Sequence, residues 1–254
     1  MMNASSSLKI SVVTATWNCA ETISDCLASV ASQSYSDIEH VVIDGASTDS
    51  TLSILQKHRS QIDTLISEKD RGIYDALNKG IAHSTGDVVG FLHADDVFDS
   101  PDVLKKVAEA FSDRRVCAVY GDLLYVRKDD TSKVVRRWRS SPFSTRALKL
   151  GWMPPHPTLY VRREWYSRIE GFDTRYRISA DYFSVLQLFS MSGFKATYLP
   201  FVFVKMRLGG ESNRSIRNLI RKSREDMDAL RRSGVGGFGA LIWKNVSKLT
   251  QFLK

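Results

Sequence analysis

Residues 86–96 read GDVVGFLHADD, an apolar run that ends in a histidine and two adjacent carboxylates, Asp95 and Asp96. The apolar part, Asp87–Leu92, predicts a buried strand. Two carboxylates at the end of a strand can divide two tasks, because one can bind a hard divalent cation while the other accepts a hydrogen bond from a ribose hydroxyl. The alternative is that the pair only caps the helix expected to open at Pro101.

Three similar units precede this stretch. Short apolar runs predict strands at Lys9–Thr14, His40–Ile43 and Asp63–Ser67. Each is followed by a predicted helix: one after Asn18, which has Glu21 at capping-box spacing, one at Ser50–His58 and one at Ile73–His83. Strands joined by helices indicate an α/β fold, with a mostly parallel sheet covered by helices.

In such sheets ligands bind at the carboxyl ends of the strands, so the polar residues that follow each strand belong to one edge. They are Thr14–Thr16, Asp44, Glu68–Arg71 and His93–Asp96. A carboxylate such as Asp44 can accept a hydrogen bond from a ring N–H of a base, or it can serve a glycine turn and a helix cap.

The second half is less regular. We expect a hairpin of Cys117–Val126 and Lys133–Trp138, and a loop over a cleft at residues 140–157. Helices near Arg162–Ile169 and Ala180–Met191 and a strand at Ala196–Met206 follow.

Composition excludes several classes of protein. The chain has 254 residues, 43% of them hydrophobic and 25% charged, which is ordinary for a globular protein and excludes disorder and fibrous repeats. Its three cysteines, Cys19, Cys26 and Cys117, show no CxxC spacing, so a thiolate zinc site or a disulfide framework is not expected and a reducing cytosol fits. The start, MMNASSSLK, has no signal-peptide pattern, and no apolar run is long enough to span a bilayer.

The net charge of +8 is uneven. Residues 212–254 hold ten Lys/Arg and three Asp/Glu, whereas the rest of the chain is close to neutral. A basic tail suggests an anionic surface as a partner. Confinement of the charge to the tail argues against nucleic-acid binding.

Taken in order, SVVTATWN, VVIDGASTDST, EKDRGIYDALNKGI and GDVVGFLHADD form a series that resembles the family-2 glycosyltransferases. These enzymes have the GT-A fold and use nucleotide-sugar donors. The resemblance covers residues 9–112 strongly and 150–210 more loosely, and it is nearest to bacterial members that build capsule, colanic-acid-like or O-antigen polysaccharides.

The resemblance implies donor-site roles. The base would be held by the Thr14–Thr16 segment, with Thr14 and Thr16 as named contacts, and by Asp44, with Glu21 nearby. Asp70 and Arg71 would lie beside the nucleoside, and Asp95 would meet the ribose or donor sugar. Asn78 would be either structural or a donor-side polar residue.

The same resemblance implies a metal. Asp96 would bind Mg²⁺ or Mn²⁺, which bridges the donor diphosphate and neutralises charge on the leaving group. His93 stands where relatives often carry Asn or Asp, so it is either an extra ligand or, as we favour, a neutral hydrogen-bonding group.

An inverting transfer also needs a general base for the acceptor hydroxyl. The family places an acidic residue at the start of a helix in the second half, and Asp181 in Ser179–Tyr182 matches. The alternatives are that Asp181 caps that helix, or that Asp173 is the base, although Gly171–Asp173 resembles a structural turn. His156 would touch acceptor or phosphate, or simply pack in its loop, and Ser212 would belong to a substrate loop.

The tail has two predicted apolar faces. The first contains Ile216, Leu219, Ile220, Met227 and Leu230, and the second lies within 241–253 after a glycine-rich break. Basic amphipathic helices can lie on anionic bilayers, so one expectation is a cytoplasmic enzyme that is peripheral on the inner face of the plasma membrane. The other is that the tail packs on the catalytic domain or on a second copy in a homo-oligomer.

The sequence thus predicts a GT-A domain at 1–211, with a donor half at about 9–112 and an acceptor half at 113–211, and a basic tail at 212–254. The predicted function is a metal-dependent, inverting glycosyltransferase with a nucleotide-sugar donor, UDP-sugars favoured, and a saccharide or lipid-linked acceptor. The alternatives are a sugar-nucleotide-binding protein without transferase activity, a nucleotidyltransferase, and a basic nucleic-acid-binding protein. A nucleotidyltransferase would need a glycine-rich basic loop after the first strand, where this chain has TATWN.

Overall fold

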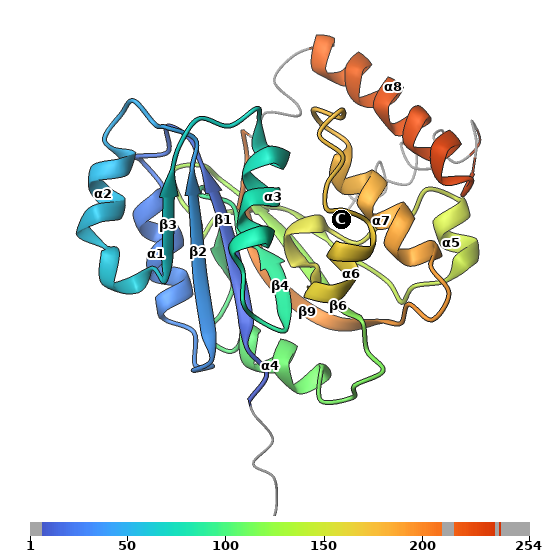
Figure 1. Ribbon diagram of the computed structural model, residues 1–254, viewed down its shortest axis with the longest axis horizontal. Helices are drawn as coiled ribbons and strands as arrows, with labels where there is room; N and C mark the ends of the chain where they lie inside the picture. The colour runs from blue at the N-terminus through green and yellow to red at the C-terminus, as the bar shows by residue number, and fades with distance from the viewer. Residues whose placement is uncertain (1–6, 210–215, 237–238, 240–254) are drawn as a thin grey trace, which may run out of the picture.

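The computed structural model describes residues 7–209, 216–236 and 239, and in these residues a nine-stranded sheet runs through the molecule with helices on both faces (Figure 1). The strand order is β3-β2-β1-β4-β8-β6-β9-β5, and β7 pairs with β6 outside this path. The α/β fold predicted from the sequence is confirmed.

The first half forms the parallel part of the sheet. Strands β1 (Ile10–Thr16), β2 (Ile38–Asp44), β3 (Thr64–Ser67) and β4 (Val88–Phe91) pair in parallel, in the order β3-β2-β1-β4. Helices α1 (Ile23–Ala31), α2 (Thr51–Lys57), α3 (Ile73–His83) and α4 (Val103–Ala110) come between or after them. Helix α3 has the bounds predicted from the sequence.

Alternate strand residues pack into two separate cores, which is why apolar residues point to both faces of these strands. Val12 and Val42 pack with α1 and α4 on one face, whereas Val13 and Val41 pack with α3, α6 and α7 on the other. Because both faces are covered, polar side chains along the parallel strands are confined mainly to their ends.

The second half extends the sheet with mixed pairing. Strands β6 (Ala118–Val126) and β7 (Val134–Trp138) form the predicted antiparallel hairpin, and β9 (Ala196–Arg207) pairs with β6 in parallel. The sequence analysis missed β5 (Val97–Phe98) and β8 (Tyr160–Arg162), which are too short to show periodicity. The remaining elements are α5 (Thr145–Lys149), α6 (Arg163–Arg168), α7 (Ala180–Ser190), α8 (Ile216–Ser233) and the short 3-10 helices Arg59–Gln61 and His156–Thr158.

The predicted capping box between Asn18 and Glu21 is wrong. Helix α1 begins at Ile23, with Thr22 as the residue before it. Asn18 has a left-handed backbone (φ 51°) and its Oδ1 accepts the Thr48 amide at 2.8 Å, so it ties two loops together. Glu21 instead forms an exposed ion pair with Lys128 at 2.9 Å.

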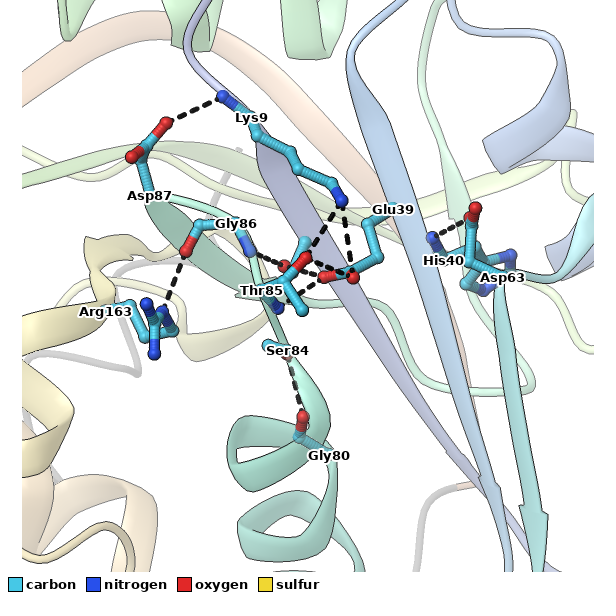
Figure 2. A network of polar contacts seen from close by, with 11 residues as sticks. Lys9, Glu39, His40, Asp63, Gly80, Ser84, Thr85, Gly86, Asp87 and Arg163 are labelled. Atoms are coloured by element: carbon cyan, nitrogen blue, oxygen red, sulfur yellow. Dashed lines mark hydrogen bonds and ion pairs between the residues drawn. The ribbon is translucent and has the colours of Figure 1, made fainter.

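A polar network fixes the amino ends of the central strands, at the edge opposite the predicted site (Figure 2). Glu39 is only 4% exposed and accepts hydrogen bonds from the amide and hydroxyl of Thr85 at 2.7 and 2.6 Å. Lys9 donates its amide to Asp87 at 2.9 Å, and Arg163 donates to the Gly86 carbonyl at 3.0 Å. These bonds hold the loop that enters β4, the strand that leads to the acidic pair.

Helix α8 packs against α7 with Ala229 and Leu230 fully buried. The single apolar stripe predicted for this helix is therefore divided, because Leu219 and Ile220 remain 48% and 50% exposed. The second predicted face, within 241–253, lies outside the described residues. Among the described helices, none combines the length and apolar character needed to cross a membrane.

Candidate active site

The carboxyl ends of β1, β2 and β3 meet in register. Thr16 is opposite Asp44, and Asp44 is opposite Ser67. The Asp44 carboxylate is fully buried and accepts hydrogen bonds from the Ser67 hydroxyl at 2.6 Å and from the amide and hydroxyl of Ser47. The Thr16 hydroxyl is buried, and it has no hydrogen-bond partner in the part of the chain that the structure describes.

The structure does not bring Thr14 to this edge. Its side chain is fully buried, and its hydroxyl lies 3.0 Å from His40 Nε2 and 3.8 Å from Cys26 Sγ. Burial lowers the pKa of His40 to about 4, so the imidazole in this contact is neutral at pH 7. Thr16, two residues later, is the last residue of the strand. Of the two threonines, therefore, only Thr16 lies at the edge of the sheet where a ligand is expected.

Trp17 is a residue that the sequence analysis did not single out. Its indole is 65% exposed although it follows directly on the buried end of β1. A Cβ on Gly45 would lie 2.5 Å from Asp70 Oδ2 and 3.5 Å from Trp17 Cδ1, so the glycine backbone brings these two side chains together over the end of β2. An exposed aromatic residue beside a cluster of carboxylates, directly after a strand, is the signal that could have identified it.

Asp70 and Arg71 stand at the start of α3. Asp70 Oδ1 accepts the Gly72 amide at 2.9 Å, whereas the Arg71 guanidinium is mostly exposed and pairs with Asp75 at 2.9 Å. The Asp75 bond raises the pKa of Arg71 further, and the guanidinium stays charged. The Asp70 carboxylate thus lies near Trp17, whereas the Arg71 guanidinium is bound to Asp75.

The acidic pair follows β4. Asp96 is 1% exposed, and its Oδ1 accepts the Arg207 amide at 3.1 Å, while its Oδ2 has no hydrogen-bond partner among the described residues. The Arg207 guanidinium donates to the Asp95 carbonyl at 2.8 Å and pairs with Asp25. The capping alternative for this pair is wrong, because Asp102 is the residue before α4.

The residues present fit a divalent cation. Burial raises the pKa of Asp96 well above its usual range, and the neighbouring Asp95 raises it further. A cation bound to Asp96 would lower this pKa again, because its positive charge favours the ionised carboxylate. In the described residues no three His, Cys, Asp or Glu side chains form a metal cluster. Mg²⁺ in nucleotide sites is commonly held by one or two carboxylates plus substrate phosphates, so a single orphaned carboxylate oxygen is a sufficient protein ligand.

Asp181 is the second residue of α7. Its Oδ1 lies 2.7 Å from the Tyr182 amide and 3.2 Å from the Tyr74 hydroxyl, which also donates to the Ile178 carbonyl at 2.6 Å. Asp95 and Asp181, which are 86 positions apart in the chain, are both close enough to His93 for their charges to favour its protonated form, although burial outweighs them and lowers its pKa.

The neighbouring polar residues mostly have structural contacts. His156 is buried, is stacked on Phe91 at 5.4 Å and lies edge-on to Phe172, which matches the packed-loop interpretation, although its Nε2 has no partner in the described chain. Burial lowers the pKa of His156 to about 4 and lowers that of His93 as well, so both are neutral at pH 7. Asn78 exchanges two 2.8 Å hydrogen bonds with the Phe172 backbone, which supports its structural alternative.

Asp173 and Ser212 are the remaining residues that the sequence singled out. The Asp173 carboxylate accepts hydrogen bonds from Arg175 at 2.7 Å and from Arg232 at 2.8 Å, and these guanidinium groups hold its pKa well below the usual range. It therefore acts as a structural turn residue, as the sequence analysis favoured. Ser212 lies outside the described residues.

Comparison with known proteins adds independent findings. The sequence profile of the family described as Glycosyl transferase family 2 matches residues 11–192. The chain is 34% identical over 174 residues to an uncharacterized glycosyltransferase of Mycobacterium tuberculosis, covering 68% of this chain and 65% of that protein. It is 32% identical over 208 residues to a PGL/p-HBAD biosynthesis glycosyltransferase of Mycobacterium bovis, covering 80% of this chain and 78% of that protein.

Solved structures share the fold. Staphylococcus aureus TarS 1-349 in complex with UDP-GlcNAc superposes with a TM-score of 0.67 at 20% identity, covering 90% of this chain and 66% of that one. The mannosyltransferase PcManGT from Pyrobaculum calidifontis, in complex with GDP-Man and Mn²⁺, gives 0.65 at 23% identity, covering 89% and 64%. At these identities the likeness shows the GT-A fold alone, and this chain spans about two thirds of the length of each.

Proposed function

Because this chain belongs to glycosyl transferase family 2, we propose that it moves a sugar from a nucleotide-diphosphate donor, with UDP-sugars favoured, to a saccharide or polyprenyl-diphosphate-linked acceptor. The proposed setting is bacterial cell-surface polysaccharide synthesis, and the similarity to the M. bovis PGL/p-HBAD biosynthesis glycosyltransferase supports an acceptor of the glycoconjugate type. The observation that carries the proposal is the buried Asp96 carboxylate after β4, whose Oδ2 has no hydrogen-bond partner among the described residues.

In this proposal the donor nucleoside lies over the ends of β1 and β2. Polar contacts to the nucleoside come from Asp70 and from Thr16, whose hydroxyl has no partner among the described residues. Asp44 holds this edge of the sheet together through its hydrogen bonds from Ser47 and Ser67. Asp95 accepts a hydrogen bond from the ribose or the donor sugar. Arg71 and Glu21, both of them in exposed ion pairs, are further proposed donor-side residues. Asp96 would hold Mg²⁺ or Mn²⁺, and such a cation supplies positive charge against the leaving diphosphate.

Asp181 then acts as general base. Its Oδ1 is engaged by Tyr74 and the Tyr182 amide, which leaves Oδ2 to take the proton of the acceptor hydroxyl. As that proton moves, the acceptor oxygen forms a bond to the anomeric carbon, and the bond from this carbon to the phosphate oxygen breaks on the opposite face. The configuration at the anomeric carbon is therefore inverted, and the nucleoside diphosphate leaves with the electron pair.

Titration calorimetry tests the donor proposal directly. UDP, GDP and dTDP are titrated into the purified full chain with and without Mn²⁺. Metal-dependent binding of one nucleotide supports the proposed site, and UDP is the expected one. Absence of binding for all three, with the fold intact by circular dichroism, would contradict the donor proposal and favour a different class of protein.

Trp17→Ala should weaken nucleotide binding, since stacking of a base on an aromatic ring is worth about 1–3 kcal/mol. Trp17→Phe should retain most of the affinity. Val135→Ala is the matched control, because Val135 is also exposed, at 55%, but lies on β7. Equal affinities for wild type and Trp17→Ala in the calorimeter would remove the indole from the donor site.

The tail carries a second proposal, that residues 212–254 contact the inner leaflet of the membrane. In α8 the exposed Leu219 and Ile220 stand among basic side chains, which suits an anionic bilayer. We expect the full chain to sediment with vesicles containing anionic lipid, and to do so less in a Leu219→Asp, Ile220→Asp variant. Equal sedimentation with purely zwitterionic vesicles would argue against this contact.

A further inference from the structure

Helix α8 reaches the segment that carries the proposed general base through one carboxylate. Glu225 Oε2 accepts the backbone amides of Ile178 and Ser179 at 2.8 and 3.0 Å, and Oε1 accepts that of Arg177 at 3.2 Å. These three residues directly precede α7, and Asp181 is the second residue of that helix. One side chain, 44 positions later in the sequence, thus binds three consecutive amides beside Asp181.

The segment that Glu225 binds leads into a helix whose start has no cap of its own. Ser179 occupies the capping position of α7, but its side chain makes no capping hydrogen bond. The amides of residues 177–179 come before the first turn of the helix, so they need an acceptor from elsewhere in the chain, which Glu225 supplies. A carboxylate at a helix N-terminus is also favoured by the helix dipole and by charge-assisted hydrogen bonding.

The same segment is held from the other side by α3. The Tyr74 hydroxyl donates to the Ile178 carbonyl at 2.6 Å and lies 3.2 Å from Asp181 Oδ1. The Ile178 residue is therefore fixed through its amide by Glu225 and through its carbonyl by Tyr74. Burial raises the pKa of Tyr74 well above its usual range, and the nearby charges of Asp181 and Glu225 raise it further, so the phenol stays protonated.

Other contacts hold α8 in place without Glu225. Asp228 accepts from the Tyr176 hydroxyl at 2.6 Å, and Arg232 donates to Asp173 at 2.8 Å and covers the Phe183 ring. Ala229 and Leu230 are fully buried. Removal of the Glu225 carboxylate should therefore release the 177–179 backbone while the helix remains docked.

We propose that Glu225 is a positioning residue, which sets the carboxylate of Asp181 against the acceptor hydroxyl by holding, from α8, the three backbone amides that lead into α7. This inference rests on the proposed role of Asp181 as general base. Helix α8 would then support the active site through Glu225, in addition to the membrane contact proposed for its exposed face.

The test uses Glu225→Ala, with Asp228→Ala as the matched control on the same helix. We expect Glu225→Ala to lower kcat about tenfold to 100-fold, because small displacements of a catalytic group have effects of this size. The KM for the donor should not change. Asp228→Ala, which removes the bond of α8 to the Tyr176 hydroxyl and none to residues 177–179, should leave kcat within about threefold. Glu225→Gln, which keeps one acceptor oxygen, should fall between wild type and Glu225→Ala.

Two readouts separate positioning from general destabilisation. Hydrogen exchange should show lost protection of the Arg177, Ile178 and Ser179 amides in Glu225→Ala, with protection within α8 retained. In an Asp181→Asn background, Glu225→Ala should cause no further loss of kcat, since both changes act through one group. Additive losses, unchanged kcat, or unchanged protection of these amides would each overturn the proposal. Full activity of Asp181→Asn alone would instead refute the proposed base.

Discussion

Replacing Asp181 with asparagine should lower kcat by about 10²–10⁴-fold, the usual contribution of a general base. The amide keeps the shape of the side chain and an oxygen for the Tyr74 and Tyr182 contacts, so the fold should be retained. Nucleotide affinity should not change, because Asp181 is proposed to act on the acceptor and not on the donor. Steady-state transfer assays and nucleotide calorimetry on the same preparation measure both quantities.

Asp173→Asn is the informative comparison for this variant. Asp173 is the neighbouring carboxylate that the sequence left as an alternative base, but it is engaged by Arg175 and Arg232. Its replacement should affect stability more than the chemical step. If Asp173→Asn abolished transfer at unchanged stability while Asp181→Asn remained active, the roles of the two residues would have to be exchanged.

Replacing Asp96 with alanine should remove the metal dependence of donor binding and lower kcat/KM about 100-fold or more, because charge stabilisation by a bound cation is worth several kcal/mol. Calorimetric titration of UDP with and without Mn²⁺ measures the first effect. In the variant the two titrations should coincide.

Asp99→Asn is the matched control for Asp96→Ala. Asp99 is three positions later, beyond β5, and pairs with Lys205 at 3.2 Å, so its change should leave the Mn²⁺ dependence intact. Loss of a buried carboxylate can also disturb Arg207, whose amide bonds Asp96, and a thermal melt checks this. Retained Mn²⁺ enhancement in Asp96→Ala would show that the cation is held elsewhere.

The donor half was largely predictable from the sequence, because its signals are local. Apolar runs of strand length and helical periods located β1 to β4 and α1 to α3, and α3 has the predicted bounds. The rule that polar residues after parallel strands share one edge brought together Thr16, Asp44 and the acidic pair. Thr14 shows the limit of this rule, since two residues decide whether a side chain ends in the core or at the edge.

The acceptor half was less predictable, because its contacts join distant segments and its strands are short. Strand β8 has three residues and shows no period, yet it lies between β4 and β6 in the sheet. His156 was open to two interpretations until the structure stacked it on Phe91. The apolar pattern of α8 could not reveal that Leu230 faces α7 while Leu219 faces outward, because periodicity does not identify the partner of a helix.

Local pattern and motif order were enough to predict the family, the α/β fold and the positions of the carboxylates that are proposed to act. How those carboxylates are held depends instead on contacts between distant segments of the chain. Arg207 bonds Asp96 across 111 positions, Tyr74 contacts Asp181 across 107, and Glu225 binds the Ser179 amide across 46. Such bonds have no signature in the sequence, because a buried hydrogen bond depends on where the two chain segments pack and not on the residues around either partner.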